Sequence, residues 1–89
     1  MFTFILEFRG GTYVSQTHSS TLSKAINDWG EKLLSTDVKY LGLSGKKQIL
    51  CMLEEVETIP LNGLINTWFF CLNIRQGFLS VNVVKTATL

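Results

Sequence analysis

The side chains best suited to catalysis in this chain are one histidine, two cysteines and a few asparagines. A thiol activated by an imidazole, which an amide in turn orients, is the nucleophile of several enzymes. Two predicted β-hairpins place His18 and Cys71 on one sheet face, together with Asn73 or Asn82. His18 ends its strand whereas Cys71 lies in mid-strand, and a flat sheet face offers no cleft or oxyanion hole. We therefore interpret these residues as a surface histidine and a half-buried thiol, and predict no enzymatic activity.

Other candidate sites depart from the motifs they approach. The segment 42–47 (GLSGKK) precedes a predicted helix, but it lacks the GxxxxGK spacing and the serine or threonine after the lysine that a phosphate-binding loop needs. We interpret it as a glycine-rich turn and predict no cofactor. One histidine and two cysteines do not supply the four ligands of a zinc site, so no metal is predicted. Cys51 and Cys71 fit a reducing compartment, where a cysteine usually packs as a small buried apolar residue, and the sequence leaves a disulfide between them open.

The segment 75–78 (RQGF) has the character of the aromatic strand of RNA-recognition modules, in which a phenylalanine stacks on a base. Those modules alternate strand and helix from the start, whereas this chain opens with a hairpin, so we interpret the segment as a turn. Phe69 and Phe78 still leave nucleic-acid or small-ligand binding as an alternative function. That alternative predicts salt-dependent binding and a cluster in space of Arg9, Arg75 and Lys85.

Two tight β-hairpins, at residues 2–19 and 67–86, are the elements that position these side chains. In the first hairpin, Gly10-Gly11 accepts positive φ at both central positions of a two-residue turn, which pairs Phe8 with Tyr13. Because side chains alternate between the two faces of a strand, the predicted buried face consists of Phe2, Phe4, Leu6, Phe8 and Tyr13. The reverse face consists of Ile5, Glu7, Val14, Gln16 and His18.

In the second hairpin, the predicted turn Gln76-Gly77 pairs Arg75 with Phe78 and gathers the apolar side chains on one face. If one strand were shifted by one residue, the apolar side chains of the other would share a face with polar side chains. The agreement between the two strands therefore supports this register. The predicted buried face consists of Trp68, Phe70, Leu72, Ile74, Leu79, Val81 and Val83. The reverse face is only half polar and consists of Phe69, Cys71, Asn73, Arg75, Phe78, Ser80, Asn82 and Val84.

Residues 20–34 are predicted to form an amphipathic helix that covers the buried face, with Ser19 or Ser20 as its cap and Trp29 inserted between the two hairpins. Residues 35–46 are predicted to be a loop. The segment 46–57 has apolar residues at helical spacing and good helix formers, so we favour a second helix capped by Ser44, with a buried strand as the alternative. Residues 56–65 are then an irregular connection. The predicted order is ββααββ, or ββαβββ in the alternative.

Composition is typical of one small α+β domain spanning residues 1–89. The chain is 46% hydrophobic and 17% charged, below the average charged fraction of about 25%, and we expect it to fold without a metal or a disulfide. A net charge of +1 argues against nucleic-acid binding, because domains that bind nucleic acid usually carry a clear excess of basic residues. No apolar stretch approaches the roughly 20 residues of a membrane span, and the start lacks a basic region followed by an apolar block. These features predict a cytoplasmic protein that does not enter a membrane.

Residues 2–34 resemble the N-terminal part of HicB-type antitoxins, which also run strand, glycine turn, strand and amphipathic helix with a small or apolar residue near the helix centre. Residues 16–21 lack the proline-rich, glycine-containing segment usual in that family, and the C-terminal hairpin stands in place of its DNA-binding element. The resemblance implies a small domain that binds a protein partner or self-associates, without the DNA-binding half. No functional residue of the family carries over to this chain.

The apolar character of the predicted reverse face is the main functional signal in the sequence. An antiparallel sheet of about four strands, with its helices on one face, usually shows polar alternation on the other, and an exposed apolar patch tends to mark an interface. We therefore predict a protein-association domain that meets a homo-oligomer partner or another small protein through Ile5, Val14, Phe69, Phe78 and Val84. The alternative is that the 56–65 connection or the C-terminal tail covers these residues.

Overall fold

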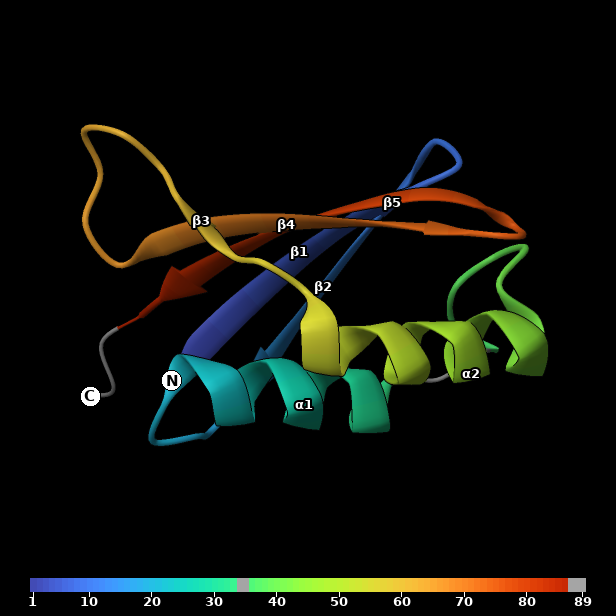
Figure 1. The fold of residues 1–89 in the computed structure, drawn as a ribbon, viewed down its shortest axis with the longest axis horizontal. Coiled ribbons are helices and arrows are strands. Elements are labelled where there is room, and N and C mark those ends of the chain that lie inside the picture. Colours follow the sequence, from blue (N-terminus) through green and yellow to red (C-terminus); the bar gives the residue numbers. More distant parts are fainter. Residues whose placement is uncertain (34–35, 87–89) are drawn as a thin grey trace.

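A five-stranded antiparallel sheet forms one layer of the protein, and two helices form the other (Figure 1). This computed structural model describes residues 1–33 and 36–86. The strands are β1 (Phe2–Phe8), β2 (Gly11–Thr17), β3 (Ile59–Pro60), β4 (Thr67–Ile74) and β5 (Gly77–Lys85), in the spatial order β2-β1-β5-β4-β3. The α+β class is therefore confirmed. The sheet has five strands and not about four, because residues 59–60 of the predicted irregular connection pair with Phe69 and Trp68.

The first hairpin turns one residue earlier than predicted. Phe8 pairs with Gly11 and not with Tyr13, and the two turn residues are Arg9 (φ 49°) and Gly10 (φ 83°). Positive φ at both central positions is the signature of the hairpin turn that matches the strand twist. Contacts made elsewhere favour this turn, because the Arg9 guanidinium lies 4.4 Å from the centre of the Tyr40 ring and donates a hydrogen bond of 3.3 Å to the carbonyl of Gln76.

The second hairpin is displaced in the same way. Ile74 pairs with Gly77, so Arg75-Gln76 forms the turn, and Arg75 does not pair with Phe78. The side chain of Gln48 accepts a hydrogen bond from the Arg75 backbone N–H at 2.9 Å and donates one to Gln76 Oε1 at 2.8 Å. In both hairpins the partner of each residue moves by two positions, which leaves every side chain on its predicted face.

Helix α1 (Leu22–Lys32) lies within the predicted range 20–34, but neither Ser19 nor Ser20 caps it. Thr21 is the cap, and its hydroxyl accepts a hydrogen bond of 3.2 Å from the Lys24 N–H. Ser19 is engaged elsewhere, because its hydroxyl donates to an Asp28 carboxylate oxygen at 2.7 Å. The predicted end at residue 34 lies outside the described residues.

The second helix is confirmed, and it begins earlier than predicted. Helix α2 (Gly42–Met52) is followed by a short 3₁₀ turn, η1 (Leu53–Glu55). Ser44 is not its cap, because the helix begins inside the segment predicted to be a loop. Gly45 is buried against the Leu41 side chain, which itself is 1% exposed, so this glycine permits close packing and does not interrupt the helix.

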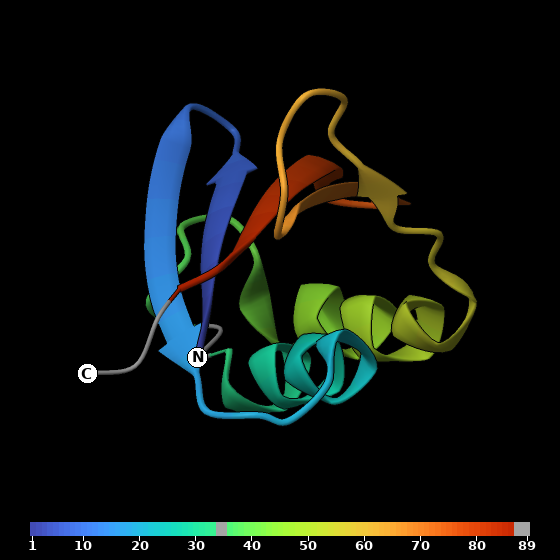
Figure 2. The same cartoon turned by 90° about the vertical axis from the view of Figure 1, so that its left-hand side faces the viewer.

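The core fills the space between the helices and the inner sheet face, and the two helices lie side by side beneath the sheet (Figure 2). Trp29 of α1 joins the two hairpins as predicted. Its ring stacks on Phe4 of β1 at 5.5 Å between centroids and meets Phe70 of β4 edge-on at 5.8 Å. The predicted inner face is therefore confirmed, with Trp68 and Tyr13 partly buried at its margins.

One buried polar group on the inner face has no partner among the described residues. The Thr17 hydroxyl at the end of β2 makes no hydrogen bond, although the residue is only 2% exposed. A buried hydroxyl without a partner costs free energy on folding. We predict that Thr17→Val, which keeps the shape and removes the hydroxyl, raises the free energy of unfolding by about 1 kcal/mol in urea denaturation.

Thr12, which is exposed on the same strand, provides the matched control, and Thr12→Val should change this free energy by less than about 0.5 kcal/mol. A loss of stability in Thr17→Val would contradict the prediction and indicate that the hydroxyl is hydrogen-bonded in solution.

Candidate functional site

The outer face of the sheet, on the side away from the helices, is the candidate functional surface (Figure 1). One row of directly paired residues crosses all five strands on this face. Ile5 pairs with Val14 on one side and with Asn82 on the other. Phe69 pairs with Asn82 and with Ile59. The row, which we name the apolar row because four of its five side chains are apolar, consists of Val14, Ile5, Asn82, Phe69 and Ile59.

Rows of mainly polar residues, with Val84 as the apolar exception, border the apolar row on both sides. Glu7 pairs with Thr12 and Ser80, and Ser80 pairs with Cys71. On the other side, Thr3 pairs with Gln16, which donates a hydrogen bond of 3.0 Å to the Thr3 hydroxyl, and with Val84. The outer face thus has an apolar centre line with a polar margin, the arrangement common in protein interfaces.

The structure brings four of the five predicted interface residues together and separates the fifth. Ile5, Val14 and Phe69 lie in the apolar row, and Val84 lies in the neighbouring row. Phe78 pairs with Asn73 near the turn, four residues along β4 from Phe69, which is about 13 Å in an extended strand. Val14 is 64% exposed and Phe78 is 55% exposed, whereas Ile5, Phe69 and Val84 are half-buried.

Sequence reasoning missed Ile59, which is 56% exposed at the end of the apolar row. The neighbouring Pro60 argued against a strand at this position, because proline is rare in the interior of a sheet. Proline is compatible with an edge strand, which is what β3 forms. Two further apolar side chains, Leu64 (59% exposed) and Ile65 (88% exposed), lie on the connection between β3 and β4. That connection rises above one end of the sheet on the side away from the helices (Figure 1). It borders the outer face and leaves Val14 exposed; residues 87–89 of the C-terminal tail lie outside the described residues.

His18 and Cys71 lie far apart. Cys71 is in register with Ser80, Glu7 and Thr12 on the outer face, whereas His18 follows Thr17, the last residue of the edge strand β2, six residues beyond Thr12. Three strand spacings and six residues of extended chain separate them by about 24 Å. This distance excludes direct proton transfer between the thiol and the imidazole. Both cysteines are free and exposed. This differs from the buried position predicted for a cysteine in general and from the half-buried position predicted for Cys71, because Cys51 is exposed on α2 and Cys71 lies on the outer face.

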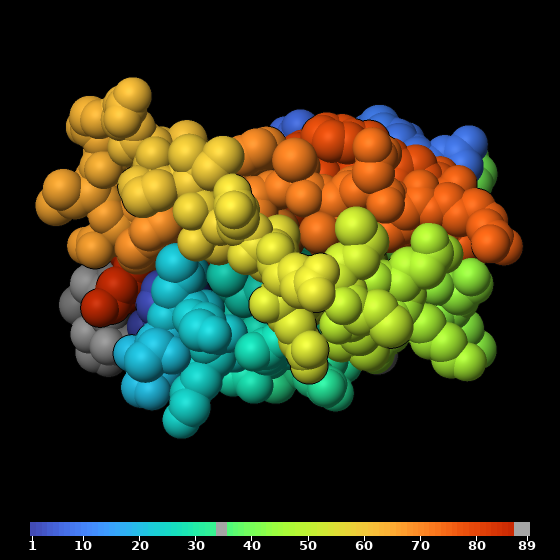
Figure 3. All heavy atoms as spheres, viewed as in Figure 1, coloured from blue at the N-terminus to red at the C-terminus, as the bar shows by residue number. Residues whose placement is uncertain are grey.

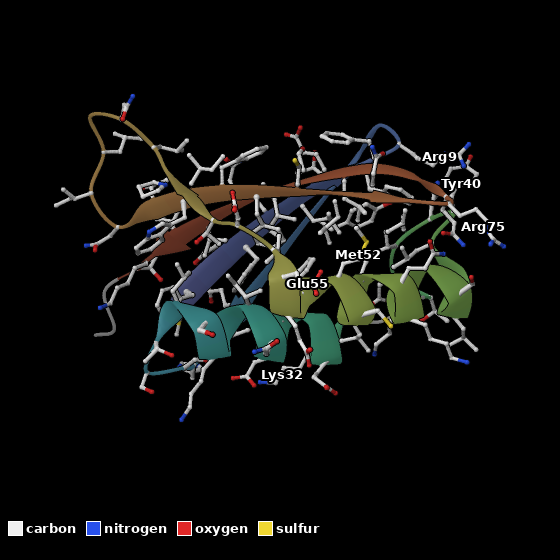
Figure 4. The ribbon with its side chains drawn as sticks, in the orientation of Figure 1. Arg9, Lys32, Tyr40, Met52, Glu55 and Arg75 are labelled. Carbon is white, nitrogen blue, oxygen red and sulfur yellow. The ribbon has the colours of Figure 1, made fainter. Side chains whose placement is uncertain are left out.

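The predicted basic cluster is divided between the two ends of the sheet. Arg9, Tyr40 and Arg75 lie at the end formed by the hairpin turns (Figure 4). Lys85 pairs with Phe2 at the opposite end, seven residues from Arg9 along the strand and hence about 23 Å away. The three basic residues are therefore dispersed, and Lys85 is in register with Phe2 of the inner face and not with the outer face. Arg9 contacts the Tyr40 ring and donates a hydrogen bond to the Gln76 carbonyl.

The separation of His18 from Cys71 can be tested by thiol chemistry. In a Cys51→Ser background, we predict that iodoacetamide alkylates Cys71 at the same rate, within about twofold, whether residue 18 is histidine or alanine, because an imidazole about 24 Å away cannot activate the thiolate. The rates should be measured by mass spectrometry across neutral pH. A tenfold slower reaction in His18→Ala would show that the two groups meet in solution.

The described residues contain no group of three or more histidine, cysteine, aspartate or glutamate side chains placed to hold a metal ion. Neither described helix, at eleven residues each, has the length and apolar character needed to cross a membrane. No model of a known protein family, no curated protein and no solved structure matches this chain.

Proposed function

We propose that this chain is a protein-association domain whose outer sheet face packs against the same face of a second copy. The observation that carries the proposal is the apolar row, which crosses all five strands on the face that the helices leave uncovered. Exposed apolar rows with polar margins are energetically unfavourable in water and are typical of surfaces that become buried on association.

The size of the face supports a dimer. Four strands about 4.8 Å apart and seven to nine residues long, with the two-residue β3 at one edge, present an area of about 20 × 25 Å, or about 500 Å² per copy. Two such faces bury about 1,000 Å² in total, which is about the minimum for a specific interface. Leu64 and Ile65, at the rim of the same face, supply further apolar surface for a partner.

The apolar row is also self-complementary about its middle residue. Asn82 lies on β5, the central strand, with two apolar side chains on either side of it. A two-fold axis through this point, parallel to the strands, places Ile5 against Phe69 of the partner subunit and brings the two Asn82 amides together. An amide has both donors and an acceptor, so two copies can satisfy each other across the axis.

The test is the oligomeric state. We predict that the wild-type chain is a dimer by sedimentation equilibrium, and that Ile5→Lys weakens the dimer by about 100-fold because it buries an unpaired ammonium in the interface of each copy. Phe69→Lys should act in the same way, and Phe78→Lys should act more weakly because Phe78 lies outside the apolar row.

Leu43→Lys is the matched control, because Leu43 is an equally apolar residue, 71% exposed, on α2 and away from the outer face. A strictly monomeric wild-type chain at high concentration would overturn pairing with a second copy. Capture of a different protein that is lost in Ile5→Lys would then identify the outer face as the interface with that protein, and binding of a protein partner is one of the two outcomes that the HicB resemblance implies.

Binding of nucleic acid through the same face is the alternative function, and the dispersed charge argues against it. We predict no salt-dependent binding of single-stranded oligonucleotides in fluorescence anisotropy at low ionic strength, because phosphate contacts need clustered cations. Tight binding that is weakened by both Arg9→Ala and Lys85→Ala would contradict this prediction and favour the alternative.

A further inference from the structure

Part of strand β4 has backbone groups without a partner in the sheet. Leu61 N–H donates to the carbonyl of Thr67, and Lys85 N–H donates to that of Asn66, so odd residues of β4 face β3 and even residues face β5. Phe69 is paired with Ile59 of β3. Cys71 and Asn73 follow with the same orientation, and among the described residues β3 does not reach them. Their N–H and C=O groups therefore point to an open edge.

Both ends of this open stretch are closed. Ile59 and Pro60 occupy the edge beside Phe69 and Trp68, and the Gln48 side chain takes the Arg75 N–H. The stretch from Cys71 to Asn73 is therefore about 10 Å long and admits three or four residues of extended chain. Strand β4 of a second copy has eight residues and is too long for this stretch, because it would clash with β3 at one end and with Gln48 at the other.

A cleft of about 460 Å³ lies beside the open stretch. Its walls are the end of α2, the connection 55–57 and the edge of β4, and its apolar lining includes Met52, Val56 and Leu72. Met52 rises from α2 toward β4 (Figure 4), and Figure 3 shows the same side of the molecule, with α2 in green below the orange of β4. The unbranched side chain of methionine is flexible and can adapt to apolar side chains of different shape.

The rim of this cleft is acidic. Glu55 and Glu57 line it and are exposed, and within residues 1–33 and 36–86 no lysine or arginine lines it. A bound segment with a cationic side chain beside these carboxylates would gain favourable Coulomb energy, whereas an acidic segment would be repelled.

We propose that the open stretch of β4 is a docking site for a short extended peptide segment of another protein, which adds a strand to the sheet. The backbone of the segment pairs with Cys71 and Asn73, an apolar side chain enters the cleft beside Met52, and a lysine or arginine lies beside Glu55 and Glu57. Strand addition to an open edge, with a pocket that reads alternate side chains, is an established mode of peptide recognition.

The experiment uses the full chain, labelled with ¹⁵N, and three peptides of the form acetyl-XVK-amide in which X is leucine, valine or phenylalanine; X and the lysine lie on the same side of the extended chain. Without peptide, the Cys71 and Asn73 amides should exchange with solvent faster than those of Phe70 and Leu72, which face β5. Addition of peptide should slow exchange at Cys71 and Asn73 and shift the resonances of Met52. Methylating the peptide nitrogen that pairs with β4 removes one hydrogen bond and should weaken binding by about tenfold.

Charge exchange provides the matched controls. The double substitution Glu55→Lys and Glu57→Lys should weaken binding of the lysine peptides and favour the same peptides with glutamate in place of lysine. Glu54→Lys should leave binding unchanged, because Glu54 lines a different cleft, against α1. Failure of all three peptides to protect Cys71 and Asn73, or equal binding of the methylated peptide, would overturn the proposal. Ile5→Lys should leave peptide binding intact, which separates this site from dimerisation through the outer face.

Discussion

The antiparallel pairing of β1 with β5 is the constraint on which the rest of the structure depends. It joins two hairpins that are separated by the whole helical segment, and it places Phe4 directly beside Val83 and Leu6 beside Val81. These four side chains are completely buried. Trp29 then contacts one aromatic ring from each hairpin, so α1 packs against a surface that exists only after β1 and β5 have paired. The long-range pairing and the helix packing therefore stabilise each other.

The sequence predicts the faces of the sheet better than its turns. Alternation along each strand assigns Phe2, Phe4 and Phe8 to the core whichever neighbouring residues form the turn, provided that the register moves by an even number of positions. Glycine preference alone selected Gly10-Gly11, whereas the folded protein places Arg9 in the left-handed region. In this turn Arg9 contacts Tyr40 and Gln76, which belong to segments far along the chain. These contacts cannot be predicted from the residues around the turn.

The same limit applies to the candidate surfaces. Ile5, Val14 and Phe69 were predictable because the two hairpins alone determine their face. The apolar row was not, since it needs the pairing of β1 with β5 and the short edge strand β3. The open stretch of β4 depends on two other segments: β3 begins at Ile59, opposite Phe69, and Gln48 on α2 reaches the backbone of Arg75. Neither the start of β3 nor the Gln48 contact has a sequence signature.

Strand β4 connects the two surfaces physically. Phe69 belongs to the apolar row on the outer face, and it also borders the cleft at the edge of the sheet. A strand added beside Cys71 and Asn73 would extend the sheet in its own plane, and alternate side chains of that strand would project onto the outer face. Occupation of the edge would thus enlarge the outer face without covering it. Association through the face and recognition of a peptide at the edge are therefore geometrically compatible.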